Sequence, residues 1–476
     1  MEIFQPRPLE AGFETEYAND LILVDTLWGG DVGIPGANAH FIADTYPDPT
    51  TEVQLPPAYS DPQVIALRED NTKSDNDDGK LSAEDRAELI NSIVGKYDLL
   101  DIPERLDATL GQEIPQLRRH FVANMGRCFD VMAHLAASKA NKKILAPSFE
   151  ERYIVATRRA PELIDPAELR EHLRATLASV GLEVTTSRDL RETTAAYTHQ
   201  VGIVSPEQFE QEVARVNKEL MDQIRINIFR KLHFRFDGHA DEHLEDVAFD
   251  GLKFEAFNKP DSHISGSSCY LGGLTSDGKP AFRDLVEFNA GHPITRPALW
   301  HICSHEMKPG HYVDSVAADI GWRCKKLGLE AVAHTMCTTE TVVREGWAQK
   351  ALAMAFGGSE QAVIDALGSE HAVEFAIDRL VDAGKHNGPI LLQRDGQSLD
   401  AVKEYLARDC VQSDLYVRKL VAWSKHPILG SMYAPGYAVG HDVLTKAVEK
   451  YGALRVAEVA LHQEGYQDID TFQQAL

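Results

Sequence analysis

One stretch of the sequence carries side chains that could hold a metal ion, namely His301-Ile-Cys-Ser-His305-Glu306-Met-Lys-Pro309-Gly310-His311. In His-Glu-x-x-His sites both imidazoles lie on one face of a helix, and the glutamate takes a proton from the metal-bound water. Here His311 follows His305 by six positions, about 240° around a straight helix, so the rings would point apart. Pro309 and Gly310 permit a break that would turn His311 back. The stretch predicts a metal site; the alternative is that Pro-Gly merely ends a helix.

A catalytic zinc site needs a third protein ligand and an open coordination position. Three downstream glutamates compete for this place, Glu330, Glu340 and Glu345. Glu345 stands before Gly346, which would let a neighbouring helix approach closely, and Trp347, which could pack beneath the site. We therefore predict Glu345 as the third ligand.

Two further interpretations stay open at this point. His301 and His305 are four residues apart and could bind a metal without His311. The six-residue spacing could also never close on a metal, which would leave a non-catalytic helical protein with a degenerate site. Two histidines and one carboxylate suit Mn²⁺, Co²⁺ or Fe²⁺ as well as Zn²⁺.

The bulk composition is that of an ordinary globular chain, with 476 residues, 43% hydrophobic and 25% charged. Lys and Arg total 48 against 73 Asp and Glu, a net charge of −25. This balance argues against nucleic-acid and anionic-membrane partners, because both require basic patches. The 6 cysteines form no CxxC pair, the amino terminus lacks a basic-then-apolar signal, and no apolar run reaches membrane-spanning length. We expect a cytoplasmic protein with buried thiols.

Most of the chain has helical patterns. Residues 165–181 begin with an Asp cap and end in glycine, and residues 206–232 form a long amphipathic pattern. After residue 298 helices are expected to the end, roughly over 298–308, 326–357, 359–384, 398–424 and 437–463.

The first 80 residues are rich in Gly, Pro, Asp and Asn. The glycine-rich stretch 29–36 does not match phosphate-binding loops and is interpreted as a surface loop. Residues 74–85 faintly resemble a calcium loop, but we favour a polar loop before a helix capped by Ser82.

Strand patterns are confined to residues 247–257, 268–272 and 283–289. They predict a small antiparallel sheet next to the helix that carries His305 and Glu306. The whole chain is predicted to be mainly α. Residues 1–240 would form a mostly helical region that packs on a metal-binding catalytic region, 241–476, in one compact unit.

Four motifs between about 300 and 445 carry a family resemblance: His305-Glu-Met-Lys-Pro-Gly-His311, Glu345-Gly-Trp-Ala348, Arg379-Leu-Val-Asp382-Ala-Gly384-Lys-His386 and Pro435-Gly-Tyr437-Ala-Val-Gly440. They resemble the HExxPGH, EGWA, RLVxDxGxH and PGQA–YxxG elements of a large bacterial family of uncharacterised zinc-peptidase-like proteins in the gluzincin group. The EGWA element is also similar to the NEGFA of aminopeptidase N-like enzymes, in which the glutamate binds zinc. The chain departs from the family after Gly310, where His311-Tyr-Val-Asp replaces the usual His-His-Leu-Gln.

The resemblance implies a gluzincin-like fold and one Zn²⁺ bound by His305, His311 and Glu345. Glu306 would be the general base that later returns the proton to a leaving amine. The implied function is a zinc-dependent hydrolase, metallopeptidase-like, that cleaves a C–N bond in a small peptide or amino-acid amide. The alternative is a specialised metal-dependent biosynthetic enzyme acting on a C–N bond of a small molecule.

Further residues receive roles only through the resemblance. Tyr437, or else His386 or His441, would stabilise an oxyanion. Arg379 would hold His386 or a substrate carboxylate, and His441 is a second candidate for substrate binding. The sequence alone does not indicate the oligomeric state.

Overall fold

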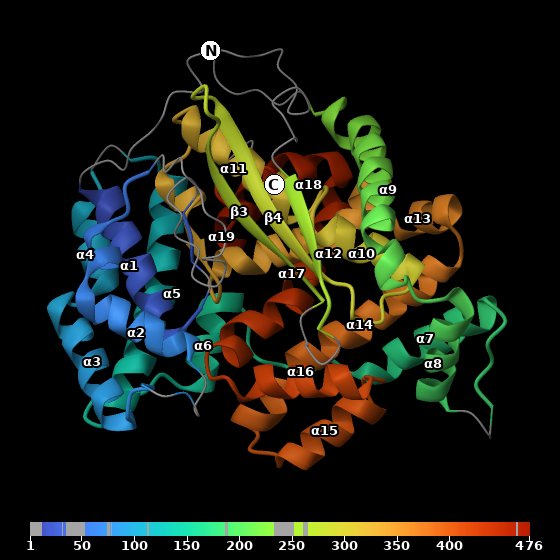
Figure 1. The fold of residues 1–476 in the computed structure, drawn as a ribbon, viewed down its shortest axis with the longest axis horizontal. Coiled ribbons are helices and arrows are strands. Elements are labelled where there is room, and N and C mark those ends of the chain that lie inside the picture. The colour runs from blue at the N-terminus through green and yellow to red at the C-terminus, as the bar shows by residue number, and fades with distance from the viewer. Residues whose placement is uncertain are drawn as a thin grey trace.

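Helices make up most of the described chain, which confirms the prediction of a mainly α protein (Figure 1). The structure is a computed structural model, and it describes residues 12–30, 32–34, 53–73, 77, 79–111, 114–185, 189–232, 252–259, 265–462 and 465–476. A three-stranded sheet runs diagonally from the top of the view toward its centre, with helices of the carboxy-terminal half on both sides of it and below it.

The amino-terminal helices gather on one side of the molecule, at the left of Figure 1. They are α1 (Phe13–Trp28), α2 (Pro62–Thr72), α3 (Ala83–Lys96), α4 (Ile102–Thr109), α5 (Gln116–Ala140) and α6 (Phe149–Thr157). The Ser82 side chain caps α3 by accepting a hydrogen bond from the backbone N–H of Asp85, as predicted. The possible calcium loop falls partly outside the described residues, because positions 74–76 and 78 are among those not described.

The predicted helices in the middle of the chain are present. They are α7 (Pro166–Ser179), α8 (Leu190–Val201) and α9 (Pro206–Ile224), the last extended by a π turn over Arg225–Phe229. Asp165 caps α7 by accepting from the backbone N–H of Ala167. One apolar face of α9, with Phe209, Val213 and Val216, is fully buried, as its spacing predicts.

The sheet is mixed, so the predicted purely antiparallel sheet is wrong. Its strands are β2 (Leu252–Phe257), β3 (Gly266–Leu274) and β4 (Pro280–Asn289), in the order β2-β4-β3. A tight turn joins β3 to β4, and these two strands are antiparallel, whereas β2 lies parallel to β4 on its other edge. Alternating residues indicate which face of a strand is buried but not the direction in which it pairs. Residues 247–251 of the first predicted strand lie outside the described residues.

The carboxy-terminal half divides into more helices than the sequence pattern suggests. They are α10 (Arg296–Glu306), α11 (His311–Arg323), α12 (Thr339–Ala355), α13 (Glu360–Leu367), α14 (Glu370–Pro389), α15 (Leu399–Arg408), α16 (Asp414–Lys425), α17 (Ala434–Tyr451), α18 (Ala453–Ala460) and α19 (Ile469–Ala475). Residues 326–338, predicted to be helical, instead contain a short 3₁₀ turn and strand β5 (His334–Thr335). Strand β5 pairs with β1 (Val32–Gly33), a part of the glycine-rich stretch.

Helix α11 was not among the predicted helices, and its packing gives the reason. Val313 and Val316 belong to the large core beneath the sheet, whereas Ala318 and Trp322 belong to the core of the amino-terminal helices. A helix that is buried on opposite faces shows no amphipathic pattern in its sequence. The two cores meet at α11, so the helix that begins with His311 is held from both sides.

None of the described helices is both long enough and apolar enough to cross a membrane. In the described part of the chain the 6 cysteines form no disulfide with one another. The cytoplasmic location and the division into regions 1–240 and 241–476 stay predictions.

Candidate metal centre

A break between two helices brings His305 and His311 together. The Thr295 side chain caps the start of α10, which ends at Glu306, and α11 begins at His311. Within the break the backbone N–H of Gly310 donates to the carbonyl of Ser304 at 2.9 Å. A Cβ atom at Gly310 would clash with the carbonyl oxygen of His305. The turn therefore requires glycine for the space it leaves, not for an unusual φ.

The two imidazoles and the Glu345 carboxylate converge on one point. The ring centroids of His305 and His311 lie 4.8 Å apart, with the rings nearly perpendicular at 88°. Glu345 Oε2 lies 3.4 Å from His305 Nε2 and 3.8 Å from His311 Nε2. One ligand atom from each residue lies within 4.8 Å of the other two, and no other such group is found among the described residues.

Close packing of α12 against α17 carries Glu345 into this place. Gly346 and Gly440 face each other, and a Cβ atom on either would run into the backbone of the other helix. The close approach expected at Gly346 is therefore present. The indole Nε1 of Trp347 donates to the carbonyl of Pro309 at 2.8 Å, so Trp347 packs against the helix break, as expected.

The electrostatics of Glu345 and His311 suit a bound cation, whereas those of His305 favour its protonated form. Burial lowers the pKa of His305, but the neighbouring Glu345 and Glu306 outweigh it and raise this pKa. Burial raises the pKa of the Glu345 carboxyl, but the neighbouring His311 and His305 outweigh it and hold this pKa at about 2. Burial lowers the pKa of His311 to about 4, with Glu345 opposing. A carboxylate and a neutral imidazole are the protonation states in which these side chains bind metals. Glu345 Oε2 is also buried without a hydrogen-bond partner.

Glu306, the last residue of α10, lies beside the three groups. Burial is the main cause that raises the pKa of its carboxyl, and Glu345 adds to the increase while His305 opposes it. A Cβ atom at Gly266 of β3 would stand 3.4 Å from Glu306 Cγ, so the sheet edge contacts this side chain. The sheet thus lies against the end of α10 that carries His305 and Glu306.

Tyr437 lies next to the candidate metal centre, together with Tyr433, which the sequence analysis missed. The Tyr433 hydroxyl donates to Glu345 Oε1 at 3.0 Å and lies 2.8 Å from the Tyr437 hydroxyl. The Tyr437 ring is stacked on that of His305 at 6.3 Å. Tyr433 belongs to a π turn, Leu429–Tyr433, and such turns often occur at functional sites. The feature of the sequence that could have identified Tyr433 is its spacing of four residues from Tyr437.

Two lysines near Glu306 and Glu345 were also missed. Lys385 Nζ lies 3.3 Å from the ring centroid of Tyr437 and 3.3 Å from Asp382 Oδ1. Lys419 of α16 interacts electrostatically with Lys385 and both glutamates. Lys385 lies within the quoted RLVxDxGxH-like stretch, whereas nothing in the local sequence marks Lys419.

The structure does not bring His386, Arg379 or His441 to the three converging residues. His386 Nε2 bonds to the carbonyl of Glu162 at 2.7 Å, and its ring meets Tyr153 edge-on. Arg379 forms an ion pair with Glu360 of α13. His441 Nε2 lies 3.4 Å from Thr445 Oγ1 on its own helix, and burial lowers its pKa well below the ordinary value. The contacts given for these three side chains are therefore with residues outside the converging set.

The rival glutamates have other surroundings. Glu330 is fully buried and forms an ion pair with Arg118 at 2.6 Å. Glu340 is buried near Arg344, with 3.8 Å between Glu340 Oε1 and Arg344 Nη1, and burial raises its pKa to about 8. Neither belongs to the group of converging ligand atoms.

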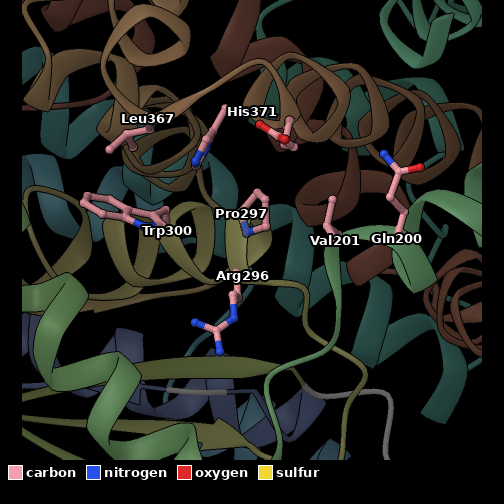
Figure 2. A pocket seen from close by; sticks show the side chains of 8 residues that line it. Gln200, Val201, Arg296, Pro297, Trp300, Leu367 and His371 are labelled. Carbon is pink, nitrogen blue, oxygen red and sulfur yellow. The ribbon is translucent and has the colours of Figure 1, made fainter. Parts of the chain in front are cut away.

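His301 faces away from His305, toward α14. Its Nδ1 lies 2.8 Å from Asp378 Oδ2, and its Nε2 lies 3.4 Å from His371 Nδ1. His371 lines a cavity of about 300 Å³ whose wall includes Trp300 and Pro297 (Figure 2). No residue of the converging set, His305, His311 and Glu345, lines this cavity. In this structure His301 does not join His305 in an alternative metal site.

Comparisons with known proteins support the fold only. No protein-family model and no curated protein matches the chain. Among solved structures it is similar to a "putative lipoprotein" from Colwellia psychrerythraea, at TM-score 0.50 and 12% identity, covering 83% of this chain and 67% of that one. It is also similar to a "putative lipoprotein of unknown function" from Shewanella oneidensis, at TM-score 0.49 and 13% identity, covering 86% and 81%. The resemblance to the gluzincin-group family stays a prediction.

The comparison with the Colwellia psychrerythraea structure overturns the predicted function. That structure, at TM-score 0.50, is described as a "putative lipoprotein" and not as a hydrolase or metalloprotease. The prediction of a zinc hydrolase that cleaves a C–N bond is therefore wrong, and hydrolysis forms no part of the function that we propose. The physical reason is that a ligand motif specifies a metal site, whereas the reaction depends on substrate contacts that the motif does not encode.

Proposed function

We propose that this protein binds one divalent transition metal ion through His305, His311 and Glu345. The observation that carries the proposal is the convergence of their three ligand atoms, all within 4.8 Å of one another. Glu345 Oε2 is buried without a hydrogen-bond partner, so a cation there would satisfy it.

Two of the three separations between the ligand atoms are close to those around a small tetrahedral ion. Ligands at about 2.0–2.1 Å from zinc are separated from one another by about 3.3 Å in a tetrahedron. The distances from Glu345 Oε2 to the two Nε2 atoms, 3.4 Å and 3.8 Å, are close to this value. Zn²⁺ is our first candidate, and Mn²⁺, Co²⁺ and Fe²⁺ accept the same ligand set.

The surrounding residues would orient the ligands and handle protons. The Tyr433 hydroxyl holds Glu345 Oε1, which leaves Oε2 to face the imidazoles. Glu306 has its pKa raised by burial and is placed to take up or release a proton next to the centre. A metal bound there would supply a Lewis acid with a position open to an outside ligand. We therefore propose a metal-dependent enzyme.

Metal content tests the proposal directly. We expect about one zinc per wild-type chain by mass spectrometry, because three ligands already converge. His311→Ala should weaken zinc binding about 10³-fold in competition with a chelator. The total zinc-binding free energy of protein sites, about 10–16 kcal/mol, is divided among few ligands, so the loss of one ligand removes a large part of it. Glu345→Gln should also weaken it, because a neutral amide replaces the anionic ligand.

The matched control is His301→Ala, on the same helix and one turn away, which should keep its zinc affinity within about threefold. A wild-type protein that binds no zinc, cobalt or manganese would refute the proposal. A loss of metal in the His301 variant equal to that in the His311 variant would refute the ligand set.

A further inference from the structure

The net charge of the protein is −25, yet two lysines face the candidate metal centre. Lys385 comes from α14 and Lys419 from α16, and both interact electrostatically with Glu306 and Glu345. Lysines brought from separate helices to one buried place are not the scattered surface charges that make an acidic protein soluble. Their position indicates that they interact with a specific negatively charged group.

The positive charge of Lys385 is already partly neutralised by Asp382. Its Nζ lies 3.3 Å from Asp382 Oδ1, and its side chain is only 11% exposed. The Asp382 carboxylate also accepts hydrogen bonds from Gln349 at 2.8 Å and 2.7 Å. Lys385 Nζ stands 3.3 Å from the centroid of the Tyr437 ring, which fixes it close to the tyrosine pair beside Glu345.

Lys419 has no such partner among the residues that the structure describes. Its Nζ lies 5.0 Å from the centroid of the Trp423 ring and 5.9 Å from that of Tyr416, at distances typical of cation–π contacts. Trp423 in turn contacts Tyr433 and Tyr437, at centroid distances of 5.4 Å and 6.1 Å. Aromatic rings therefore hold the ammonium beside the centre without neutralising it.

The charge near the centre becomes more positive when a divalent cation binds. Lys385 and Lys419 lie there with three carboxyl groups, those of Glu306, Glu345 and Asp382. A site that holds a divalent cation and an ammonium without a carboxylate partner favours a ligand that brings negative charge.

We propose that the centre includes an anion subsite in which Lys419, assisted by Lys385, binds the carboxylate of a small molecule held at the metal. This inference rests on the proposed metal function. A singly charged carboxylate fits better than a doubly charged phosphate, because Lys385 already shares its charge with Asp382. Lysine binds such groups as a point charge with three donors.

The test compares two probe ligands of equal chain length, succinate and butyrate, on the zinc-loaded protein by calorimetry. Either can place one carboxylate at the metal, but only succinate has a second carboxylate for Lys419. We expect succinate to bind about tenfold more tightly than butyrate, as one charge-assisted contact provides. Lys419→Gln should abolish this preference while the zinc content stays at one per chain.

Lys425→Gln is the matched control, because Lys425 is an exposed lysine in the last turn of the same helix. It should keep the preference for succinate. Equal affinities of the two probes for zinc-loaded wild-type protein, or a preference that survives in Lys419→Gln, would overturn the subsite alone. Inorganic phosphate that binds more tightly than succinate through Lys419 would overturn the assignment to carboxylates. A wild-type protein that takes up no metal would instead overturn the metal function, and the subsite with it.

Discussion

Helix α10 takes part in two clusters that each contain two histidines and one carboxylate. At its end, His305 joins His311 and Glu345, and the three ligand atoms lie within 4.8 Å of one another. One turn earlier, His301 joins His371 and Asp378 in a row: Asp378 Oδ2 lies 2.8 Å from His301 Nδ1, and His301 Nε2 lies 3.4 Å from His371 Nδ1. The same residue types converge on one point in the first cluster and form a row of pairwise contacts in the second.

The difference shows what a metal site requires beyond composition. Both ring nitrogens of His301 are used by its neighbours, so no lone pair is left for a cation. In the other cluster the Nε2 atoms of His305 and His311 and the Oε2 atom of Glu345 face one another, and Oε2 accepts no hydrogen bond. The helix break after Glu306 creates that convergence, because on a continuous helix the two imidazoles would diverge.

The largest effect is expected when the helix break is disturbed without a change in any ligand. In Gly310→Ala the new methyl group would clash with the His305 carbonyl, so we expect a loss of about 3 kcal/mol or more in the free energy of unfolding. Urea unfolding followed by circular dichroism measures this loss, and zinc affinity should fall with it. Gly95→Ala in α3 is the control, since nothing lies within 4 Å of its added Cβ. It should be neutral or stabilising by up to about 1 kcal/mol. Unchanged stability and zinc affinity in Gly310→Ala would show that the break does not hold the imidazoles together.

The row formed by Asp378, His301 and His371 should make the stability of the protein depend on pH. Burial, with a smaller effect of His301, lowers the pKa of His371 to about 3 from its ordinary 6.5. Between about pH 3 and pH 6.5 the unfolded chain binds a proton at His371 that the folded protein does not bind. The free energy of unfolding therefore decreases as the pH falls below 6.5. In His371→Asn this residue cannot bind a proton, so the decrease due to it is absent. Its stability deficit relative to wild type should therefore shrink by about 2 kcal/mol between pH 7 and pH 5. Parallel pH profiles of urea unfolding for the two proteins would contradict a neutral His371.

The smallest expected effect concerns the orientation of Glu345. Tyr433→Phe removes the hydroxyl that donates to Glu345 Oε1 at 3.0 Å. Zinc affinity should fall about tenfold, at the lower end of the range for residues that orient ligands. Competition with a chromogenic chelator measures it, with Tyr451→Phe, an exposed tyrosine of α17, as the control. Equal zinc affinity in Tyr433→Phe and wild type would show that the bond does not fix the carboxylate.

Local sequence was sufficient for features that depend on neighbouring residues. Ser82 and Asp165 were predicted as helix caps, and both accept the backbone hydrogen bonds that caps provide. The Pro-Gly pair predicted a break before His311, and Gly346 predicted a close helix approach. Both follow from backbone conformation and side-chain size, which the sequence contains directly.

Tertiary packing decided the features that depend on distant segments. The direction of β2, the position of α11 between two cores and the turn of His301 toward Asp378 are each determined by contacts far apart in the chain. His386 was given a catalytic role by its motif, but Glu162 and Tyr153 from the first half of the chain hold it elsewhere.

What the sequence by itself determined was the set of side chains with metal-binding chemistry and the helices that carry His305 and Glu345, because ligand type and helical spacing are local properties. Which of those groups share one point in space was decided only by the fold. The packing of α12 on α17 sets the place of Glu345. Lys419, whose surrounding sequence has no motif, comes close to Glu306 because α16 packs beside α14. Electrostatic and coordination energies depend on distances across the chain, and those distances exist only in the folded molecule.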